Sequence, residues 1–369
     1  MNLNNRFFAL DVFRGMTICF MIIVNTSGNG ATTFAPLKHI DWNGFTPTDL
    51  VFPSFLFAVG NALSFVSEKW AKMAQSKVLW KIFKRTFLIF LLGYLMYWFP
   101  FFRVDEHFNT HSFPISDTRI FGVLQRIALC YGIGALMVYY FKPRTNVIIS
   151  AIILFAYWLL FINYGSYDMH HNPILDLDLK LFGENHLYHG EGFAFDPEGL
   201  MSTFPAIVNV IGGYFAGVYI QKKGKTFEGL AKLLLVGFLL IALAFMWNYG
   251  FQINKKLWTS SYVLLTVGLD LMIISAIIYY TDFLHQTRGT YFFEVFGKNP
   301  LVIYLLSELL VIIFYITPIG NINSWGWTYQ NIFQHFGDYT GAFLMAIAYM
   351  LLCWSVGYFM DKKKIYVKL

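Results

Sequence analysis

The chain has 369 residues, of which 57% are hydrophobic, 20% are aromatic and only 13% are charged. Soluble domains carry about 25% charged residues, so this composition excludes a globular protein with a fully solvated surface. We interpret the chain as an integral membrane protein. Its net charge is +6. Because Lys and Arg accumulate on the cytoplasmic side of membrane proteins, this charge indicates topology first, and we expect no nucleic-acid partner.

A helix needs about 20 mostly apolar residues to cross the hydrocarbon core of a bilayer. By this measure the sequence predicts ten membrane-spanning helices in a single domain over residues 1–369. They are expected over 7–27, 47–67, 79–101, 119–141, 145–164, 199–220, 229–248, 259–281, 297–317 and 340–360. The predicted fold class is therefore an all-α, polytopic helical bundle whose main partner is the lipid bilayer.

The connections between these helices differ in charge. Those on one side hold most of the basic residues, which are Lys69, Lys72, Lys77, Lys81, Lys84, Arg85, Lys142, Arg144, Lys222, Lys223, Lys225, Lys232, Arg288 and Lys298, followed by Lys362, Lys363, Lys364 and Lys368 in the tail. The other side has few cations, in longer connections over 28–46, 102–118, 165–198 and 318–339 that hold eight of the nine histidines. We predict that the basic side and both termini are cytoplasmic.

Several ionisable residues fall within the predicted helices, where a charge costs about 2.5–3.5 kcal/mol on insertion scales and needs a partner or a polar cavity. Asp11 and Arg14 are spaced to pair on one helix face. Arg126 has no acidic residue within a turn, and Asp270 or Glu308 could pair with it. Such pairs either hold the bundle together or line an internal polar pocket, and the sequence leaves both interpretations open.

Residues 36–60 concentrate polar groups between two apolar segments. His39, Asp41, Trp42 and Asn43 lie in a short connection, followed by Thr46–Asp49. Thr46 before Pro47 is typical of a helix N-cap. Asp49 then lies in the first helical turn, where it either complements the helix dipole or orients the imidazole of His39 as the carboxylate partner of a general base.

The remaining candidate site residues are Asn25 and the histidines and cysteines, whose side chains can bind metals. Asn25 ends the first predicted helix, either as a simple cap or as a neighbour of His39, 14 residues further on. The side chains of the adjacent residues His170 and His171 are expected to point apart, and the pair His186–His189 lacks a clear helix or third ligand, so no metal site is expected. The three cysteines Cys19, Cys130 and Cys353 fall in apolar runs and are expected to be small buried hydrophobes.

Five segments of the chain, in order, carry a family resemblance. They are LDVFRGMTICFMIIVN, LKHIDWNGFTPTDLVFPSFLFAVG, RIFGVLQRIALCY, FDPEGLMSTFPAIVNVIGGYFAG and FGKNPLVIYLLSELL. Together they resemble the heparan-α-glucosaminide N-acetyltransferase family of transmembrane acetyltransferases and its bacterial relatives. The block from Asp11 to Gly60 is the most specific part of this resemblance.

The resemblance implies an enzyme that takes acetyl from cytoplasmic acetyl-CoA, as cosubstrate, and transfers it to the amino group of a glucosamine-type sugar across a membrane, here a bacterial cytoplasmic membrane. It implies that His39 is catalytic, with Asn25 in the same centre, and we expect Asp49 to join them as the carboxylate that orients His39. The residues expected to bind the cosubstrate are Arg14, Arg126, Lys298 and Asn299. Those expected to bind the acceptor sugar are Trp42, Asn43, Asp196 and Glu198.

Three questions stay open at this level. Ten helices with buried charges also describe a secondary transporter of a sugar or another small polar solute, and dependence on acetyl-CoA separates the two functions. The sequence also leaves open whether His39 accepts the acetyl group covalently or acts as a base for direct transfer, and whether the protein forms a homodimer.

Overall fold

A computed structural model describes residues 8–367, which form a bundle of long helices with very little sheet. Ten helices in this part of the chain have 17 residues or more. They are α1 (Phe8–Asn25), α2 (Val51–Trp70), α3 (Gln75–Trp98), α4 (Val123–Tyr140), α5 (Pro143–Tyr164), α7 (Leu200–Lys223), α8 (Phe227–Asn248), α9 (Ser260–Ile278), α11 (Pro300–Ile316) and α13 (Asp338–Lys362). Each corresponds to one of the ten predicted helices, so the predicted all-α bundle is confirmed.

Shorter elements fill the connections. They are α6 (Pro173–Phe182), α10 (Thr290–Lys298), α12 (Ser324–Thr328), and two antiparallel hairpins, β1 (Phe102–Val104) with β2 (Thr110–Ser112) and β3 (Pro318–Ile319) with β4 (Ile322–Asn323). None of these was predicted from the sequence. Residue 7 of the first predicted helix and Lys368 of the basic tail lie outside the described residues.

Length and composition support the membrane assignment of the described helices. Eight of them are long and apolar enough to span a bilayer, and α10 with α11 makes a ninth span if this pair, bent by 84°, is counted as one. The tenth long helix, α3, has Lys77, Lys81, Lys84 and Arg85 in its first half. The chain is therefore an integral membrane protein with several spans.

The break between α10 and α11 corrects one predicted boundary. The sequence predicted a helix from residue 297, but α11 starts at Pro300, after Asn299 with φ −132° and ψ 53°. Proline has no N–H to donate and disfavours helical geometry in the residue before it. Asn299–Pro300 therefore ends α10 and starts a new helix in a different direction.

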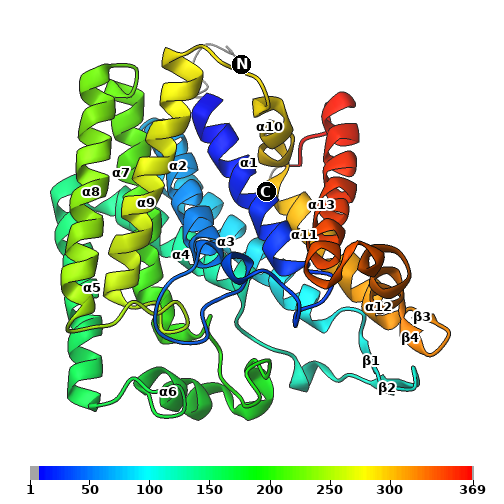
Figure 1. Ribbon diagram of the computed structural model, residues 1–369. Coiled ribbons are helices and arrows are strands. Elements are labelled where there is room, and N and C mark those ends of the chain that lie inside the picture. Colours follow the sequence, from blue (N-terminus) through cyan, green and yellow to red (C-terminus); the bar gives the residue numbers. More distant parts are fainter. Residues whose placement is uncertain (1–7, 368–369) are drawn as a thin grey trace.

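The two ends of the bundle differ. Figure 1 shows α6, both hairpins and the connection before α2 at one end, while the turns between α7 and α8 and between α9 and α10 lie at the opposite end. We call the first the loop end, which carries residues 26–50, 99–122, 165–199, 249–259 and 317–337. The second is the basic end, with the short lysine-rich turns. The predicted separation of long loops from basic turns is confirmed.

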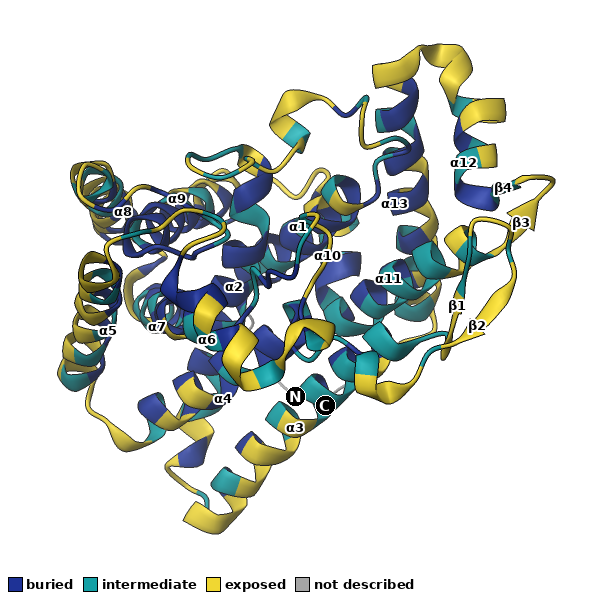
Figure 2. Cartoon of the chain, turned by 90° about the horizontal axis from the view of Figure 1, so that it is seen from below, coloured by how far each residue is buried: buried dark blue, intermediate teal, exposed yellow. Residues whose placement is uncertain are grey.

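The core lies around α1, α2, α7 and α9. The buried share of the most apolar window is 67% for α1 and α7 and 72% for α9, against 22% for α5 and 28% for α8. Figure 2 shows this contrast, with buried residues on the central helices and exposed ones on α5 and α8. The apolar side chains that α5 and α8 expose are suited to contact with lipid.

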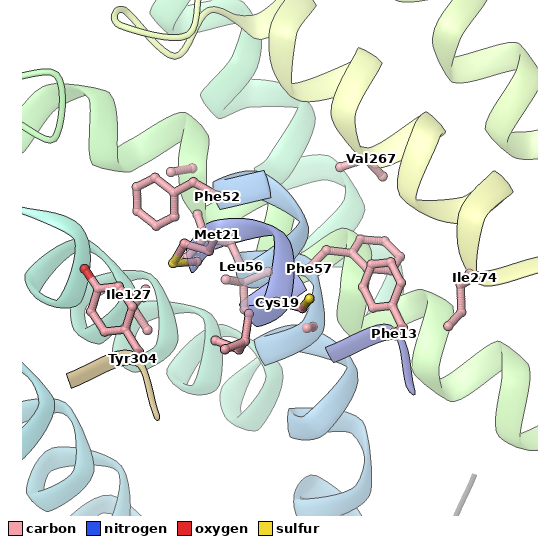
Figure 3. Close-up of a cluster of buried hydrophobic side chains, with 14 of the residues drawn as sticks. Phe13, Cys19, Met21, Phe52, Leu56, Phe57, Ile127, Val267, Ile274 and Tyr304 are labelled. Atoms are coloured by element: carbon pink, nitrogen blue, oxygen red, sulfur yellow. The ribbon is translucent and has the colours of Figure 1, made fainter. Parts of the chain in front are cut away.

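Close helix packing depends on small residues. A Cβ atom at Gly60 of α2 would lie 1.9 Å from the carbonyl oxygen of Val210, and one at Gly213 of α7 would lie 2.0 Å from that of Phe57. Figure 3 shows the core beside this contact, where Phe13 and Phe57 meet edge to face with ring centroids 5.8 Å apart. This packing fixes α2, which carries the candidate site at its first turn.

Candidate active site

The start of α2 places Asp49. Thr46 is the N-cap residue of a 3₁₀ turn, Pro47–Leu50, that runs into α2, as the Thr-Pro pattern predicted. One carboxylate oxygen of Asp49, Oδ2, accepts hydrogen bonds from the backbone N–H and the hydroxyl of Thr46, each at 2.9 Å. Asp49 is fully buried, and the hydroxyl of Tyr262 on α9 donates to its backbone carbonyl at 2.5 Å. Asp49 is therefore held from both sides.

The other carboxylate oxygen of Asp49 binds His39. Asp49 Oδ1 lies 2.8 Å from Nδ1 of the imidazole. The two oxygens of Asp49 thus have different partners, since one binds Thr46 at the helix start and the other contacts the imidazole. An ionised carboxylate accepts the N–H of Nδ1 and leaves Nε2 with a free lone pair. The side chain of His39 is 42% exposed, so a reactant can reach the ring.

Lys255 is the third member of this group, and the sequence did not single it out. Its Nζ lies 2.8 Å from Nδ1 and 3.1 Å from Nε2 of His39, and 3.7 Å from Asp49 Oδ1. Burial lowers the pKa of His39; the hydrogen bond to Asp49 opposes this and the charge of Lys255 adds to it, so the pKa stays below its ordinary value. The sequence did show Lys255 and Lys256 as an adjacent lysine pair on the side of the protein that has few cations.

Asp196 and Glu198 form a second charged group at the loop end. Arg119 binds both oxygens of Asp196, at 2.8 and 2.7 Å, and binds Glu198 at 2.7 Å. The guanidinium also lies over the rings of Tyr97 and Tyr188, 4.9 and 4.6 Å from their centroids. Arg119 was not among the predicted site residues, although the sequence showed it as an arginine at the start of a predicted helix, on the side with few cations.

Glu198 links the two groups electrostatically. Burial alone would raise its pKa, but the positive charges of Arg119, Arg126 and Lys255 hold that pKa below the usual range. In turn, the negative charge of Glu198 acts on His39 and favours its protonated form. The structure thus brings His39, Asp49 and Glu198 into one electrostatic neighbourhood, although they come from distant parts of the sequence.

Arg126 supports this neighbourhood from below. Its Nη2 donates to the carbonyl oxygens of Pro197 and Gly199, at 3.0 and 3.2 Å, and to the hydroxyl of Ser202. The side chain is fully buried and lies over the ring of Trp258. Arg126 therefore fixes the segment that carries Glu198.

The predicted pairing of Arg126 with Asp270 or Glu308 is wrong. The hydroxyl of Ser54 donates to Asp270 at 2.5 Å, and Glu308 accepts a hydrogen bond from the side chain of Asn25. Nη2 of Arg126 takes carbonyl oxygens at the end of a loop as its acceptors, and the sequence alone does not show that such oxygens converge. Asn25 does end α1 as predicted, and its described partner is Glu308.

Trp42 and Asn43 lie beside His39 and contact two other segments. The indole N–H of Trp42 donates to the carbonyl oxygen of Tyr167 at 3.1 Å, and its ring meets Phe195 edge to face. Asn43 accepts a hydrogen bond from the side chain of Asn254 at 3.1 Å. Both residues therefore hold the loop in place, and Asn43 remains exposed beside His39.

Three of the residues predicted to bind the cosubstrate gather at the basic end. Arg14 pairs with Asp11 at 2.8 Å, as predicted, and donates to the carbonyl oxygen of Gly297 at 2.9 Å. Lys298 pairs with Asp361 at 3.0 Å and with Glu294 at 3.2 Å. The side chain of Asn299 bonds Ile365 and Val367 of the tail. Arg126 lies apart from them, beneath the loop end.

A hollow of about 650 Å³ lies elsewhere at the loop end, between the β1–β2 hairpin and the end of α11. Phe99, Phe102, Arg103 and Tyr315 are among its lining residues. None of the predicted site residues lines it, so the convergence of charged groups around His39, and not this hollow, identifies the site. Among the described residues there is no group of three metal-binding side chains.

Comparison with known families shows to which family the chain belongs. The model of the catalytic region of heparan-alpha-glucosaminide N-acetyltransferase matches residues 6–239. The chain belongs to this family. The match includes Asn25, His39, Asp49 and Glu198, and it ends before Lys255 and Lys298.

Two curated proteins named heparan-alpha-glucosaminide N-acetyltransferase match most of the chain. The protein from Mus musculus is 29% identical over 365 residues, covering 83% of this chain and 54% of the mouse protein. The protein from Homo sapiens is 27% identical over 359 residues, covering 82% of this chain and 52% of the human protein. The chain therefore spans about half the length of the curated relatives it matches.

Proposed function

We propose that this protein is a transmembrane N-acetyltransferase that uses acetyl-CoA to acetylate the amino group of a glucosamine-type sugar. Family membership supports the reaction class. The observation that carries the proposal is the contact of His39 with a buried carboxylate, because a carboxylate at Nδ1 can orient an imidazole as a base and the His39 side chain is 42% exposed.

The chemistry follows from that contact. The amine nitrogen attacks the thioester carbonyl carbon, the carbon–sulfur bond breaks, and CoA leaves as a thiolate. Nε2 of His39 takes the proton that the amine loses, while Asp49 stabilises the imidazolium that forms. In the covalent alternative Nε2 itself attacks the thioester carbonyl carbon, and CoA leaves as a thiolate. The amine then attacks the acetyl carbon, the bond to Nε2 breaks, and the released imidazole takes the proton that the amine loses.

The acceptor is proposed to bind at the loop end. A cationic amino sugar fits a site with the carboxylate of Glu198 near His39, and the exposed amide of Asn43 is suited to sugar hydroxyls. Asp196 is fully engaged with Arg119, so we assign it the role of holding Arg119 and Glu198. Trp42 serves mainly to hold the loop through Tyr167.

The CoA phosphates are proposed to bind at the basic end, which we take as the cytoplasmic side of a bacterial membrane. Arg14 and Lys298 already have carboxylate partners. The exposed lysines at the end of α7, Lys222 and Lys223, are therefore stronger candidates for the first contact. The acetyl group must then pass through the bundle to His39.

Release of CoA tests the proposed reaction. The purified protein in lipid vesicles is given acetyl-CoA and glucosamine, and free thiol is measured. We expect release that requires both substrates and disappears in His39→Ala. No release with any amino sugar, together with vesicle uptake of a sugar that His39→Ala leaves unchanged, would contradict the enzyme and favour a transporter.

A second measurement separates the two chemical routes. The protein is incubated with acetyl-labelled acetyl-CoA without acceptor and then denatured under conditions that preserve acyl-imidazoles. Label retained on the unmodified protein and lost in His39→Ala indicates the covalent route. Label absent from both, with normal turnover once glucosamine is added, indicates direct transfer.

A further inference from the structure

The connection between α8 and α9 contains a tight turn that presents two adjacent lysines. Asn254 accepts the backbone N–H of Thr259 at 3.1 Å, and its side chain accepts that of Leu257 at 2.8 Å. In return, the hydroxyl of Thr259 accepts the N–H of Asn254 at 3.0 Å. These reciprocal bonds close the turn over residues 254–259. The direction of each lysine side chain is therefore set by a rigid backbone.

This turn is fastened to the loop that carries His39. The N–H of Gly44 donates to the carbonyl oxygen of Ile253 at 2.8 Å, and the Asn254 side chain donates to Asn43 at 3.1 Å. From the other side, the hydroxyl of Tyr157 on α5 donates to the carbonyl oxygen of Leu257 at 2.6 Å. Residues 40–46 and 253–257 thus form one unit, although more than 200 positions separate them.

Within that unit, Lys255 and Lys256 have different partners. Lys255 reaches both ring nitrogens of His39 and one oxygen of Asp49. Lys256 instead pairs with Glu191 at 2.5 Å. Both lysine side chains are largely buried, with 15% and 14% exposed. Two neighbouring lysines of equal burial therefore provide a test residue and its matched control.

The position of the Lys255 ammonium leaves the reactive lone pair free. The two ring nitrogens of an imidazole flank the same carbon atom, so an ammonium within 3.1 Å of both cannot lie along the in-plane lone pair of either. It lies over the ring, while Asp49 lies at its Nδ1 edge. His39 is thereby held between an anion at its Nδ1 edge and a cation at one face.

We propose that Lys255 is a positioning residue of the His39 centre, which fixes the ring against Asp49 and keeps the imidazole uncharged so that its Nε2 lone pair is available. This inference rests on the proposed function for its catalytic meaning. With Asp49 ionised and Lys255 protonated, the two charges cancel beside a neutral ring. A proton on His39 would place two cations against one carboxylate at distances below 4 Å.

Other charged residues near this unit do not reverse the lowering of the His39 pKa. Glu198 favours a protonated His39, but it is itself bound by Arg119. Lys256 acts on Lys255 and is compensated by Glu191. The net lowering of the His39 pKa agrees with the geometry.

The test compares three variants of the full-length protein in lipid vesicles. Lys255→Met removes the charge and keeps the length of the side chain, Lys255→Arg keeps the charge, and Lys256→Met is the matched control. The protonation of His39 is followed by NMR of histidine-labelled protein, with His39→Gln used to assign its signal. Acetyl transfer is measured over the same pH range.

We expect Lys255→Met to move the His39 titration upward by about 1 pH unit, the size of effect that a charge at this distance produces. The acidic limb of the activity profile should move with it. Lys255→Arg and Lys256→Met should move the His39 titration and the acidic limb of the activity profile by no more than about 0.3 pH units. Thermal unfolding should show that all three variants are folded. An unmoved titration in Lys255→Met, or an equal shift in Lys256→Met, would overturn the proposal. Because the titration is measured without acetyl-CoA, it stands or falls independently of acetyl transfer.

Discussion

The two ends of the bundle use charge in different ways. At the loop end, charged side chains from the connection before α2, the segment before α7 and the turn before α9 converge on His39. At the basic end, the ion pairs of Lys298 join it to Glu294, one helical turn away, and to the end of α13. Arg14 likewise pairs with Asp11 on its own helix.

The two ends differ in whether a titratable group stays accessible to a reactant. The pairs at the basic end satisfy their members and close the ends of α10 and α13. At the loop end, His39 keeps an exposed edge beside a fully buried carboxylate. Convergence from distant segments around a partly open titratable group indicates chemistry, whereas local pairs indicate structural support. The predictions below test this contrast.

Replacement of His39 by Ala should have the largest effect on activity. Loss of a positioned acid–base group costs about 10²–10⁴-fold in rate, and loss of a nucleophile costs at least as much. The measurement is the initial rate of CoA release with saturating glucosamine. His335→Ala, at an exposed histidine of the same end, is the control and should retain the full rate. Equal loss in both variants would remove the special role of His39.

Replacement of Arg119 by Met should have the largest effect on stability. Asp196 is buried and bound by two nitrogens of the guanidinium, Nε and Nη2, and loss of one partner of a buried ion pair costs about 3–5 kcal/mol. Denaturant unfolding in detergent micelles measures the free energy. The double variant Arg119→Met/Asp196→Asn should recover part of the loss, because it no longer buries an unpaired charge. No recovery would mean that Arg119 acts mainly through Glu198 and the tyrosine rings.

The sequence predicted the ten long helices because apolar runs of membrane length are a strong signal. It placed Asp49 correctly, since Thr46 and Pro47 define a helix start and put Asp49 in the first turn. It missed α10 and α6, which are short, and it missed Lys255. No local pattern connects residue 255 with residue 39; their contact depends on how the α8–α9 turn folds against the first loop. The partner of Arg126 was predicted wrongly for the same reason, because its contacts with Pro197 and Gly199 depend on how a distant loop folds.

Replacement of Lys298 by Met tests the basic end. Its side chain is 14% exposed and has two carboxylate partners. We expect the free energy of unfolding to fall by about 1–2 kcal/mol, between the values for exposed and buried pairs. The KM for acetyl-CoA should change less than about threefold, since its charge is already neutralised. A tenfold rise in KM with unchanged kcat would instead assign Lys298 to the CoA phosphates and blur the contrast between the ends.

Asp178 on α6 should make the stability of the protein depend on pH. Burial raises the pKa of its carboxyl group to about 7. The folded protein therefore holds a proton that the unfolded chain releases above its ordinary pKa near 3.8. The stability contributed by Asp178 is present at low pH and is lost as the pH rises toward 7, by at most about 1.4 kcal/mol per pH unit. Unfolding of Asp178→Asn at pH 5 and pH 7 should show a smaller pH dependence than the unmodified protein. An unchanged or steeper dependence would contradict the raised pKa.

Transfer across a sealed membrane tests the central claim most directly. The protein is reconstituted in one orientation, with labelled acetyl-CoA in the compartment that faces the basic end and glucosamine in the compartment that faces the loop end. The account predicts labelled N-acetylglucosamine in the glucosamine compartment, abolished by His39→Ala. Product that forms only when both substrates share one compartment, or that persists in His39→Ala, would contradict it.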